Sequence, residues 1–382
     1  MKIRVSSQHL ADAVAYTARA IATRPVVPVM AGILLTAGQG GLELAASDHE
    51  VYATDRLHAE VADEGRELVP GRLLADITAR LPKGADVDLD SDGTRLTIAC
   101  RTARFSLPLL PVDEYPALPG LPPAVATVQA DTWADACAQI VIAASTDQSL
   151  PILTGVHLTL DGDQAVLNAT DRYRIGWRRL TVTHTGPAAD QALRVLIPAK
   201  TAGDTARAFA SDRPLTLHSD GDGLFGWSTT GGRTFTTRLL SGEYPKLADM
   251  IPDAHLTVTV PADEMAAAVQ RVALVAERNT ALRLTVLDGE LLIEGGCGDD
   301  AHGADTIPAT IVGDPGEHAG PSGRHTVAFN PGYLADGIKA CAADEVTLHL
   351  GHPHKPGRIT AHTGPGDDEP YRYVLMPVRL TA

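Results

Sequence analysis

Two aspartates are the residues of this sequence best suited to general-base chemistry. Asp48 and Asp171 each end a predicted strand, in the matching runs 45–48 and 168–171. A carboxylate placed there could accept a proton from a bound substrate. The two aspartates occupy the same place in a repeat, however, and would therefore lie in separate domains. The favoured interpretation is that each one caps a turn, because aspartate side chains readily bond to nearby backbone amides.

No catalytic or metal-binding motif accompanies these carboxylates. The sequence has no G-x-S-x-G nucleophile elbow, no P-loop and no H-E-x-x-H pair. His352 and His354 could bind a metal ion, but no third ligand lies near them in the sequence. We therefore predict no catalytic residue, no metal site and no cofactor. A carboxylate-dependent enzyme remains open as an alternative of another class.

The second aspartate belongs to the most informative stretch of the chain, residues 150–180. Apolar and more polar residues alternate over Val156–Leu160, which is the pattern of a half-buried strand. The Asp-Gly-Asp run at 161–163 supplies a hairpin turn. A charged and aromatic run, Arg172–Ile175, then follows, where the first copy of the pattern has His-Glu-Val-Tyr at 49–52. This difference predicts that Arg172–Ile175 carries function.

The stretch is part of a unit that occurs three times. The same offset of 123 residues separates Pro28 from Pro151 and Asp48 from Asp171. So long a period indicates duplicated domains. Each copy is predicted to be α+β, mostly strand with two helices, in domains 1–120, 121–253 and 254–382, with a proline-rich linker between the first two. The predicted helices cover residues 7–22, 71–81, 131–145, 262–277 and 331–342, with one more opening at 197–200.

Composition limits the class of protein. A chain of 382 residues is too long for one core, and 44% hydrophobic with 4% aromatic residues indicates globular domains built from aliphatic side chains. The net charge of −15 argues against a surface that is basic all over, but it allows arginine and lysine to gather on one face. Four scattered cysteines, no signal sequence and no long apolar run predict a soluble cytoplasmic protein.

Six short motifs occur in order along the three copies. They are Arg24-Pro25 with Pro28 and Gly32, Phe105–Pro108, Leu153–Gly155, Ala169–Ile175, Phe329–Pro331 with Tyr333, and Met376–Leu380. Each motif is weak alone. Together, inside a threefold repeat, they resemble the bacterial DNA polymerase III beta subunit, the beta sliding clamp, over the whole chain. The Arg-Tyr-Arg form at 172–174 is typical of actinobacterial members.

The resemblance implies a fold and a role. In this family three tandem similar clamp domains form half of a closed ring, and two chains join head to tail around double-stranded DNA. Helices line the hole, and sheets lie outside. Family members have no catalytic activity and need no cofactor. They tether the DNA polymerase III alpha subunit, the clamp loader and repair factors, which insert short peptides between the second and third domains. We therefore expect a homodimeric processivity factor for DNA replication that binds DNA without sequence specificity.

The resemblance also assigns residues to three surfaces. The DNA-binding residues would be Arg24, Arg72, Gln148 and Lys200, although Arg24 could be only a charged helix end. The peptide-binding pocket would be formed by Leu153, Thr170, Arg172, Tyr173, Arg174, Ile175, Pro252, Tyr333, Val374, Leu375, Met376, Pro377, Val378 and Arg379. The dimer interface would join Phe105 and Leu107 of one chain to Ala273 and Leu274 of the other, through paired edge strands.

Basic residues on the predicted helices agree with a DNA-facing surface. They are Arg19, Arg72, Arg80, Lys200, Arg207, Arg271 and Lys339. Contacts of this kind to phosphates depend on salt and do not read the base sequence. The same residues could instead be solvated helix faces. Two further alternatives stay open: a protein-binding scaffold that never encircles DNA, and a clamp paralogue used in repair or inhibitor resistance.

Overall fold

The computed structural model describes residues 1–22, 25, 27–185, 192–211, 213–247, 250, 253–276, 280–297, 301–314, 323–362 and 369–379. The chain forms two compact units. The first unit contains Met1–Asp131, Val182–Asp190 and Arg207–Leu239, and the second contains Thr132–Thr181, Gln191–Ala206 and Leu240–Ala382. Within the described ranges, no helix is long and apolar enough to cross a membrane.

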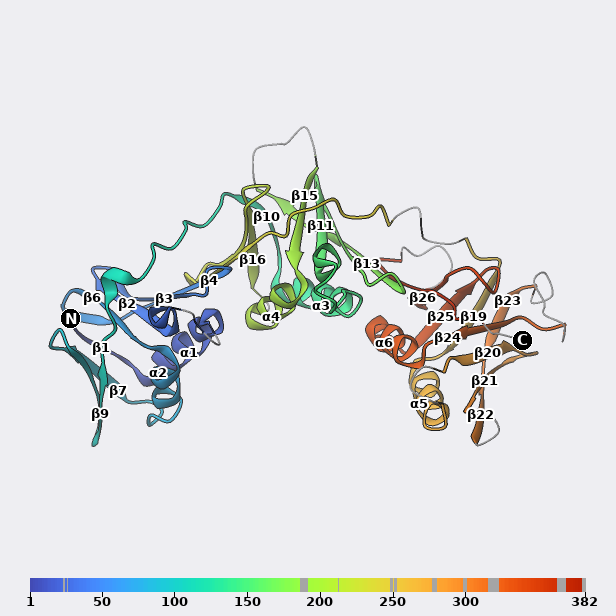
Figure 1. Cartoon of the computed structure of the whole chain (residues 1–382), viewed down its shortest axis with the longest axis horizontal. Helices are drawn as coiled ribbons and strands as arrows, with labels where there is room; N and C mark the ends of the chain where they lie inside the picture. The colour runs from blue at the N-terminus through green and yellow to red at the C-terminus, as the bar shows by residue number, and fades with distance from the viewer. Residues whose placement is uncertain are drawn as a thin grey trace. The chain divides into compact units, whose positions relative to one another are not determined.

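The first unit contains a five-stranded antiparallel sheet in the order β5-β1-β7-β8-β9 (Figure 1). Its strands are β1 (Lys2–Ser6), β5 (Glu60–Asp63), β7 (Asp86–Ser91), β8 (Arg95–Cys100) and β9 (Ala103–Pro108). Helices α1 (Ser7–Thr17) and α2 (Gly71–Thr78) pack against each other in this unit. Strand β9 ends the sheet order, so that one of its edges is left open within the described part of the chain.

A nine-stranded antiparallel sheet completes the first unit, in the order β14-β10-β16-β17-β18-β4-β3-β2-β6. The first repeat contributes β2 (Gly32–Gly38), β3 (Gly41–Ser47), β4 (Val51–Leu57) and β6 (Gly65–Pro70). The second repeat contributes β10 (Ala124–Gln129), β14 (Thr183–His184), β16 (Pro214–Ser219), β17 (Leu224–Thr229) and β18 (Thr234–Arg238). The two repeats join where β18 pairs with β4, which places Phe235 opposite Ala53.

The second unit has the corresponding pair of sheets. A nine-stranded sheet runs β15-β11-β12-β13-β27-β26-β25-β19-β23, and a four-stranded sheet runs β22-β21-β20-β24. The second repeat contributes β11 (Gly155–Asp161), β12 (Gln164–Thr170), β13 (Arg174–Thr181) and β15 (Leu193–Pro198). The third contributes β19 (Leu256–Pro261), β20 (Leu282–Val286), β21 (Glu290–Cys297), β22 (Ala301–Pro308), β23 (Thr310–Gly313), β24 (Thr326–Phe329), β25 (Glu345–Leu350), β26 (Gly357–Ala361) and β27 (Tyr371–Leu375).

The second repeat thus supplies strands to both nine-stranded sheets. It is joined to the third repeat where β13 pairs with β27, which places Ile175 opposite Val374. This sharing explains why the compact units do not follow the repeats one by one. The domain boundaries at residues 120 and 253 stay a prediction.

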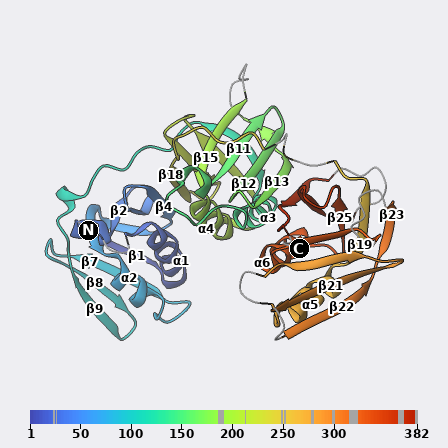
Figure 2. The same ribbon diagram turned by 45° about the vertical axis from the view of Figure 1, so that its right-hand side comes forward.

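Four further α-helices complete the set of α-helices in the described part of the chain, which also contains short 3-10 helices at Ala18–Ala20, Pro28–Ala31, Val112–Glu114 and Pro151–Thr154. The four α-helices are α3 (Ala130–Val141), α4 (Ala199–Phe209), α5 (Ala262–Ala273) and α6 (Pro331–Cys341). Helix α5 packs against α6 and lies against β21 and β22 (Figure 2). Helix α6 begins where the Asn330 side chain accepts a hydrogen bond from the Tyr333 amide at 3.1 Å, with Pro331 in its first turn. It ends at Cys341 and is followed by Ala342, which has a left-handed backbone.

Four helices end earlier than the sequence predicts. Helices α1, α2, α3 and α5 end at Thr17, Thr78, Val141 and Ala273, and the residues after them continue as tighter turns. In those turns the amides of residues 21, 81, 144 and 276 donate to the carbonyls three positions before them, at 3.2–3.3 Å. An apolar pattern continues through such a turn almost unchanged. Residue types alone therefore do not mark where the α-helix stops.

Candidate functional site

The candidate site is built on the turn between β12 and β13. One carboxylate oxygen of Asp171 accepts hydrogen bonds from the amides of Tyr173 and Arg174 at 3.0 and 3.1 Å. The Thr170 hydroxyl accepts one from the Arg172 amide at 3.1 Å. Arg172 has φ of +82°, a left-handed conformation that costs energy for any residue with a Cβ. The polar side chains of Thr170 and Asp171 hold this turn, which gives Asp171 the capping role favoured from the sequence.

Arg174 connects this turn to the third repeat. Its Nε lies 2.8 Å from the Asp171 carboxylate, and its Nη1 lies 2.7 Å from the carboxylate of Asp336 on α6. The guanidinium also sits 4.3 Å from the centre of the Tyr333 ring. Only 12% of the side chain is exposed. Burial disfavours the charge, but the Tyr373 hydroxyl and the two carboxylates outweigh burial and raise the pKa of Arg174.

Beside this turn lies a pocket of about 670 Å³ in the second unit. Ile175, Leu247 and Val374 form a buried apolar cluster there, against which Tyr244 packs. The lining residues are Leu150, Ile152, Leu153, Thr170, Arg172, Arg174, Ile175, Glu243, Tyr244, Pro245, Lys246, Leu247, Met250, Val374 and Met376. An apolar pocket with a few polar groups at its wall is suited to hold apolar side chains of a ligand while fixing its orientation.

The structure brings together half of the residues that the resemblance assigns to the peptide pocket. Those that line it are Leu153, Thr170, Arg172, Arg174, Ile175, Val374 and Met376. Tyr173 and Tyr333 lie just outside it and stack on each other, with ring centres 6.4 Å apart. Leu375 is buried opposite Arg174 in the sheet, and Pro377 is half-buried beyond Met376. Pro252 lies outside the described residues.

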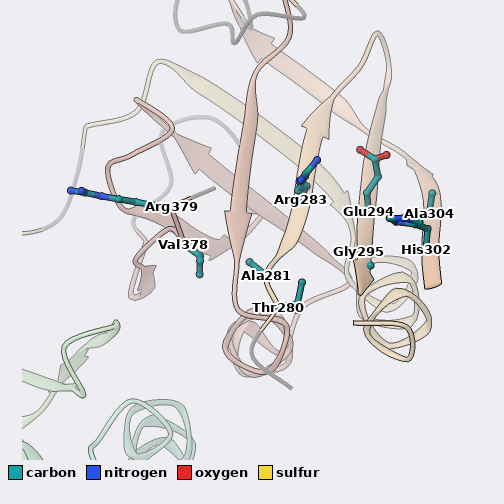
Figure 3. Close-up of a pocket in the computed structure, with 11 residues that line it drawn as sticks. Thr280, Ala281, Arg283, Glu294, Gly295, His302, Ala304, Val378 and Arg379 are labelled. Carbon is teal, nitrogen blue, oxygen red and sulfur yellow. The ribbon is translucent and has the colours of Figure 1, made fainter. Parts of the chain in front are cut away.

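Val378 and Arg379 line a different pocket, of about 590 Å³ (Figure 3). The Val378 amide donates to the Ala328 carbonyl at 2.8 Å, which ties the end of the described chain to β24. Figure 3 shows Val378 beside Ala281, which directly precedes β20, with Arg379 directed away from it. Neither residue lines the pocket beside the β12–β13 turn. Their assignment to the peptide site stays a prediction.

The sequence reasoning missed the segment that covers one side of the pocket. Tyr244, Pro245, Leu247 and Met250 all line it. The Tyr244 ring stacks on His157 of β11, with ring centres 5.0 Å apart and planes 4° from parallel. A signal existed in the repeat, because Glu-Tyr-Pro occurs both here and at 114–116. This repeated run indicated that the two segments occupy equivalent positions. It did not indicate that the second segment lies beside the β12–β13 turn.

Three of the residues assigned to DNA lie on helices or next to one. Arg72 is exposed near the start of α2, and Gln148 is exposed in the loop after α3. Lys200 near the start of α4 is 90% exposed and forms an ion pair with Asp204 at 2.7 Å. Arg24 lies outside the described residues. Exposed helical cations can contact phosphates, but their assignment to DNA stays a prediction.

The residues assigned to the dimer interface lie beside two open sheet edges. Phe105 on the edge strand β9 is 38% exposed, whereas Leu107 on the same strand is buried. Leu274, just after α5, is 85% exposed, and Ala273 is half-buried. Strand β22 ends the four-stranded sheet, and its Gly303 lies against Val275. Exposed apolar side chains beside unpaired strand edges are typical of surfaces that bind another chain.

Comparison with known families matches almost the whole chain. Residues 1–119, 127–246 and 249–379 match the N-terminal, central and C-terminal domains of the DNA polymerase III beta subunit. The chain belongs to this family. It is 42% identical over 388 residues to the beta sliding clamp of Streptomyces coelicolor, covering 100% of both chains. It is also 40% identical over 314 residues to the Micrococcus luteus clamp, covering 81% of this chain and 100% of that one.

Solved clamps share the fold. The DNA polymerase sliding clamp of Bacillus subtilis has a TM-score of 0.89 at 23% identity, with 100% of both chains covered. A clamp from Pseudomonas aeruginosa, solved bound to griselimycin, has a TM-score of 0.90 at 22% identity, again over 100% of both chains. The α+β fold of three clamp domains and the actinobacterial type are therefore confirmed. As a sliding clamp, the protein is a processivity factor and not an enzyme.

Proposed function

We propose that this clamp closes as a head-to-tail homodimer around double-stranded DNA and docks short peptides of its partners in the second-unit pocket. The partners would be the DNA polymerase III alpha subunit, the clamp loader and repair factors, in the cytoplasm. The pocket carries the peptide part of the proposal, because Ile175, Leu247 and Val374 offer an apolar floor beside Arg172 and Arg174. A linear peptide can fill such a pocket with apolar side chains while the arginines bind its polar groups.

The open edges support the dimer. Strand β9 of one chain would pair with β22 of the other, and Phe105 and Leu107 would pack on Ala273 and Leu274. Pairing would satisfy backbone groups that an open edge exposes, and it would cover Leu274. Two identical contacts of this kind close a ring, as twofold symmetry allows.

Retention of the clamp on circular and on linear DNA tests whether it encircles DNA. A closed ring should stay on nicked circular DNA and slide off the ends of linear DNA of the same length. Sedimentation should show a dimer at the concentration used. A monomer retained on neither DNA would favour a protein-binding scaffold instead. Removal of the charges at Arg72 and Lys200 should weaken retention without changing the dimer, because these residues would contact phosphates only.

Peptide docking is tested with a synthetic clamp-binding peptide from the host's DNA polymerase III alpha subunit. Met250 lines the pocket and is 42% exposed, so that Met250→Asp should abolish measurable binding without unfolding the chain. Leu121→Asp is the matched control, since Leu121 is similarly exposed and lies in the first unit. Equal loss of binding in both variants would contradict the assignment of the pocket.

A clamp paralogue used in repair or inhibitor resistance is the second candidate. The chain is 34% identical over 384 residues to the beta sliding clamp homolog GriR of Streptomyces muensis, covering 100% of both chains. Replacement of the host's main clamp gene by this one separates the two roles. Growth supported by this gene alone would assign it to bulk replication. A stable ring that does not support growth would assign it to the paralogue role.

A further inference from the structure

We propose that His157 is a positioning residue of the peptide pocket: its ring holds one wall of the pocket through the stack on Tyr244 and releases that wall on taking up a proton. The wall consists of residues 240–247, and we call it the pocket wall. The inference rests on the proposed peptide docking. It adds a residue outside the pocket lining that sets the affinity for a peptide and makes this affinity depend on pH.

The pocket wall has little backbone support of its own. It contains no helix or strand. The Leu240 amide donates to the Leu196 carbonyl at 2.9 Å, and at the other end the Leu247 carbonyl accepts from the Met250 amide at 3.0 Å. Between these ends, residues 241–246 make no backbone–backbone hydrogen bond with any residue that the structure describes. Side-chain contacts therefore have to hold the wall in place.

Two close contacts lie in the middle of the wall. Gly242 has φ of +142°, and a Cβ at this position would lie 2.5 Å from the Cγ2 methyl of Ile152, which lines the pocket. The Tyr244 ring stacks on the imidazole of His157, with ring centres 5.0 Å apart. An aromatic pair at this distance contributes more than its buried area alone. Because Tyr244 also packs against the apolar cluster of the pocket floor, the stack fixes a residue that lines the pocket.

The first repeat has an apolar pair where the second has a polar one. His157 lies 123 residues after Leu34, and the residues opposite them across their hairpins are Asn168 and Ala45. Leu34 and Ala45 are buried in the cluster around Tyr115. A leucine thus suffices to pack this place in the fold. The histidine of the second repeat calls for another explanation.

The polar pair is not satisfied by internal hydrogen bonds. The Nδ1 atom of His157 and the Oδ1 atom of Asn168 are buried, but they bond neither to each other nor to another residue that the structure describes. A neutral imidazole can carry its proton on Nε2 and leave Nδ1 bare. An imidazolium carries a proton on both nitrogens, so that its Nδ1–H would be a buried donor without an acceptor. The stacked position therefore favours the neutral ring.

The groups around His157 also disfavour its charged form. Burial first, and then the charge of Arg194 on β15, lower the pKa of His157. The residues opposite it on β12 and β15 carry no charge. Burial raises the pKa of Tyr244, which stays neutral. The other ionisable residues of the pocket wall, Glu243 and Lys246, are exposed and line the pocket.

Peptide docking should therefore be weaker in acid. With the wall in place, His157 takes up a proton only below the ordinary value of about 6.5, and the charged ring must leave the stack to reach water. A released wall has to be ordered again when a peptide docks. The measured affinity then falls with the fraction of clamps whose wall is in place. Above about pH 6.5 the ring is neutral and the affinity is complete.

The test measures binding of a synthetic alpha-subunit docking peptide to the full-length clamp. At neutral pH, His157→Ala should bind it about fivefold more weakly, which is the scale of one aromatic pair. His157→Phe keeps an aromatic ring on Tyr244 and should bind as the wild type does. Thr159→Ala is the matched control, because Thr159 is half-buried on the same face of β11, two residues farther along, and should leave binding unchanged.

The pH profile separates positioning from packing alone. Between neutral pH and about pH 5, the affinity of the wild type should fall about threefold relative to that of His157→Phe, which has no proton to take up at this position. The ratio of the two affinities removes the titration of the peptide and of other clamp residues. Thr159→Ala should show the wild-type profile, and melting curves show whether each variant is folded at both pH values.

A titration of the histidine gives an independent measurement. The imidazole signal in nuclear magnetic resonance spectra that is absent from His157→Phe belongs to His157. Its midpoint should move to lower pH when the peptide is bound, because a proton that weakens peptide binding is itself bound more weakly in the complex. A midpoint that the peptide does not move would contradict the coupling.

The outcomes separate this proposal from the docking proposal. A peptide that does not bind the wild type would sink peptide docking itself. If the wild type binds and Met250→Asp abolishes binding, the pocket stands. In that case, unchanged binding by His157→Ala, or His157→Phe as weak as His157→Ala, would overturn the positioning role. An equal fall in acid for the wild type and His157→Phe would overturn release by the proton.

Discussion

The turn after β3 in the first clamp domain and the turn after β12 in the second have the same backbone in different surroundings. Asp48 accepts hydrogen bonds from the amides two and three residues ahead at 3.0 and 2.8 Å, as Asp171 does at 3.0 and 3.1 Å. His49 has φ of +79°, and Arg172 has +82°. The duplicated domains have therefore kept the construction of this turn.

What differs is the space beside the turn. In the first domain Tyr115 is buried in a cluster with Met30, Leu68 and other apolar residues, and Leu118 packs against it. In the second domain Tyr244 and Leu247 have the same spacing, but a pocket of about 670 Å³ remains open beside them. The comparison teaches that the two domains share the supporting turn, and that the proposed peptide site is the pocket beside this turn in the second domain.

The largest loss of stability is expected when a side chain is removed from the packed cluster of the first domain. Tyr115→Ala should lower the free energy of unfolding by about 4 kcal/mol, because it empties a packed cluster. Tyr244→Ala should cost about half as much, since Tyr244 already borders open space, but it should weaken peptide binding. Urea denaturation of both variants measures the difference. Equal destabilisation would mean that the second pocket is as closely packed as the first cluster.

Arg174 is the next residue that distinguishes the two turns, because Val51 occupies its place in the first domain. Arg174→Ala should cost about 3 kcal/mol, since it leaves Asp171 and, in part, Asp336 without their partner. Arg56→Ala is the control, because its ion pair with Glu43 is exposed and should contribute about 0.5 kcal/mol. Similar losses in the two variants, measured by chemical denaturation, would show that burial of the Arg174 pair matters little.

A fall in pH should lower the stability of the two nine-stranded sheets by different amounts. His349 on β25 has its pKa lowered to about 4 by burial and then by Arg358 and Arg372. The unfolded chain takes up this proton as pH falls through about 6.5, whereas the folded chain does so only near 4. Stability from this group is thus complete above about pH 6.5 and is lost toward pH 4, by about 3 kcal/mol.

The control for this titration lies in the first unit. Burial also lowers the pKa of His218 on β16, but a hydrogen bond with the Pro122 carbonyl acts against burial. His349→Gln should therefore flatten the stability profile between pH 4 and 6.5 more than His218→Gln does. A profile unchanged by His349→Gln would contradict the surroundings described for that histidine.

The smallest effect is expected where the two turns agree. His49→Gly and Arg172→Gly should each stabilise the chain by about 0.5 kcal/mol, because glycine adopts positive φ without strain but loses more entropy on folding. Thermal melting of both variants measures the change. A gain of stability in one variant and a loss of stability in the other would show that the two turns do not have equivalent backbones.

Sequence reasoning found the turn because its signals are local. Asp171 bonds to amides within three residues, so that residue type and spacing suffice to predict its role. The repeat likewise marked equivalent strands through an exact offset. The family resemblance then supplied the assignment of Leu153, Val374 and Met376 to one pocket, which no local pattern could have provided.

The parts that sequence reasoning missed depend on contacts between distant residues. Arg174 meets Asp336, which lies 162 positions away, and nothing in the sequence around either residue indicates the pair. Tyr244 stacks on His157, although the Glu-Tyr-Pro run reads only as a repeat marker. Helix ends were also predicted too late, because a tighter final turn keeps the same apolar spacing.

The pairing of β13 with β27 has a consequence for the synthesis of the protein. Strand β13 ends at Thr181 and β27 begins at Tyr371, yet the two strands supply Ile175 and Val374 to one pocket floor. A ribosome must therefore release both the second and the third repeat before the pocket can be completed. A chain that stopped before β27 would lack Val374, and a partner that recognises the pocket would not bind it.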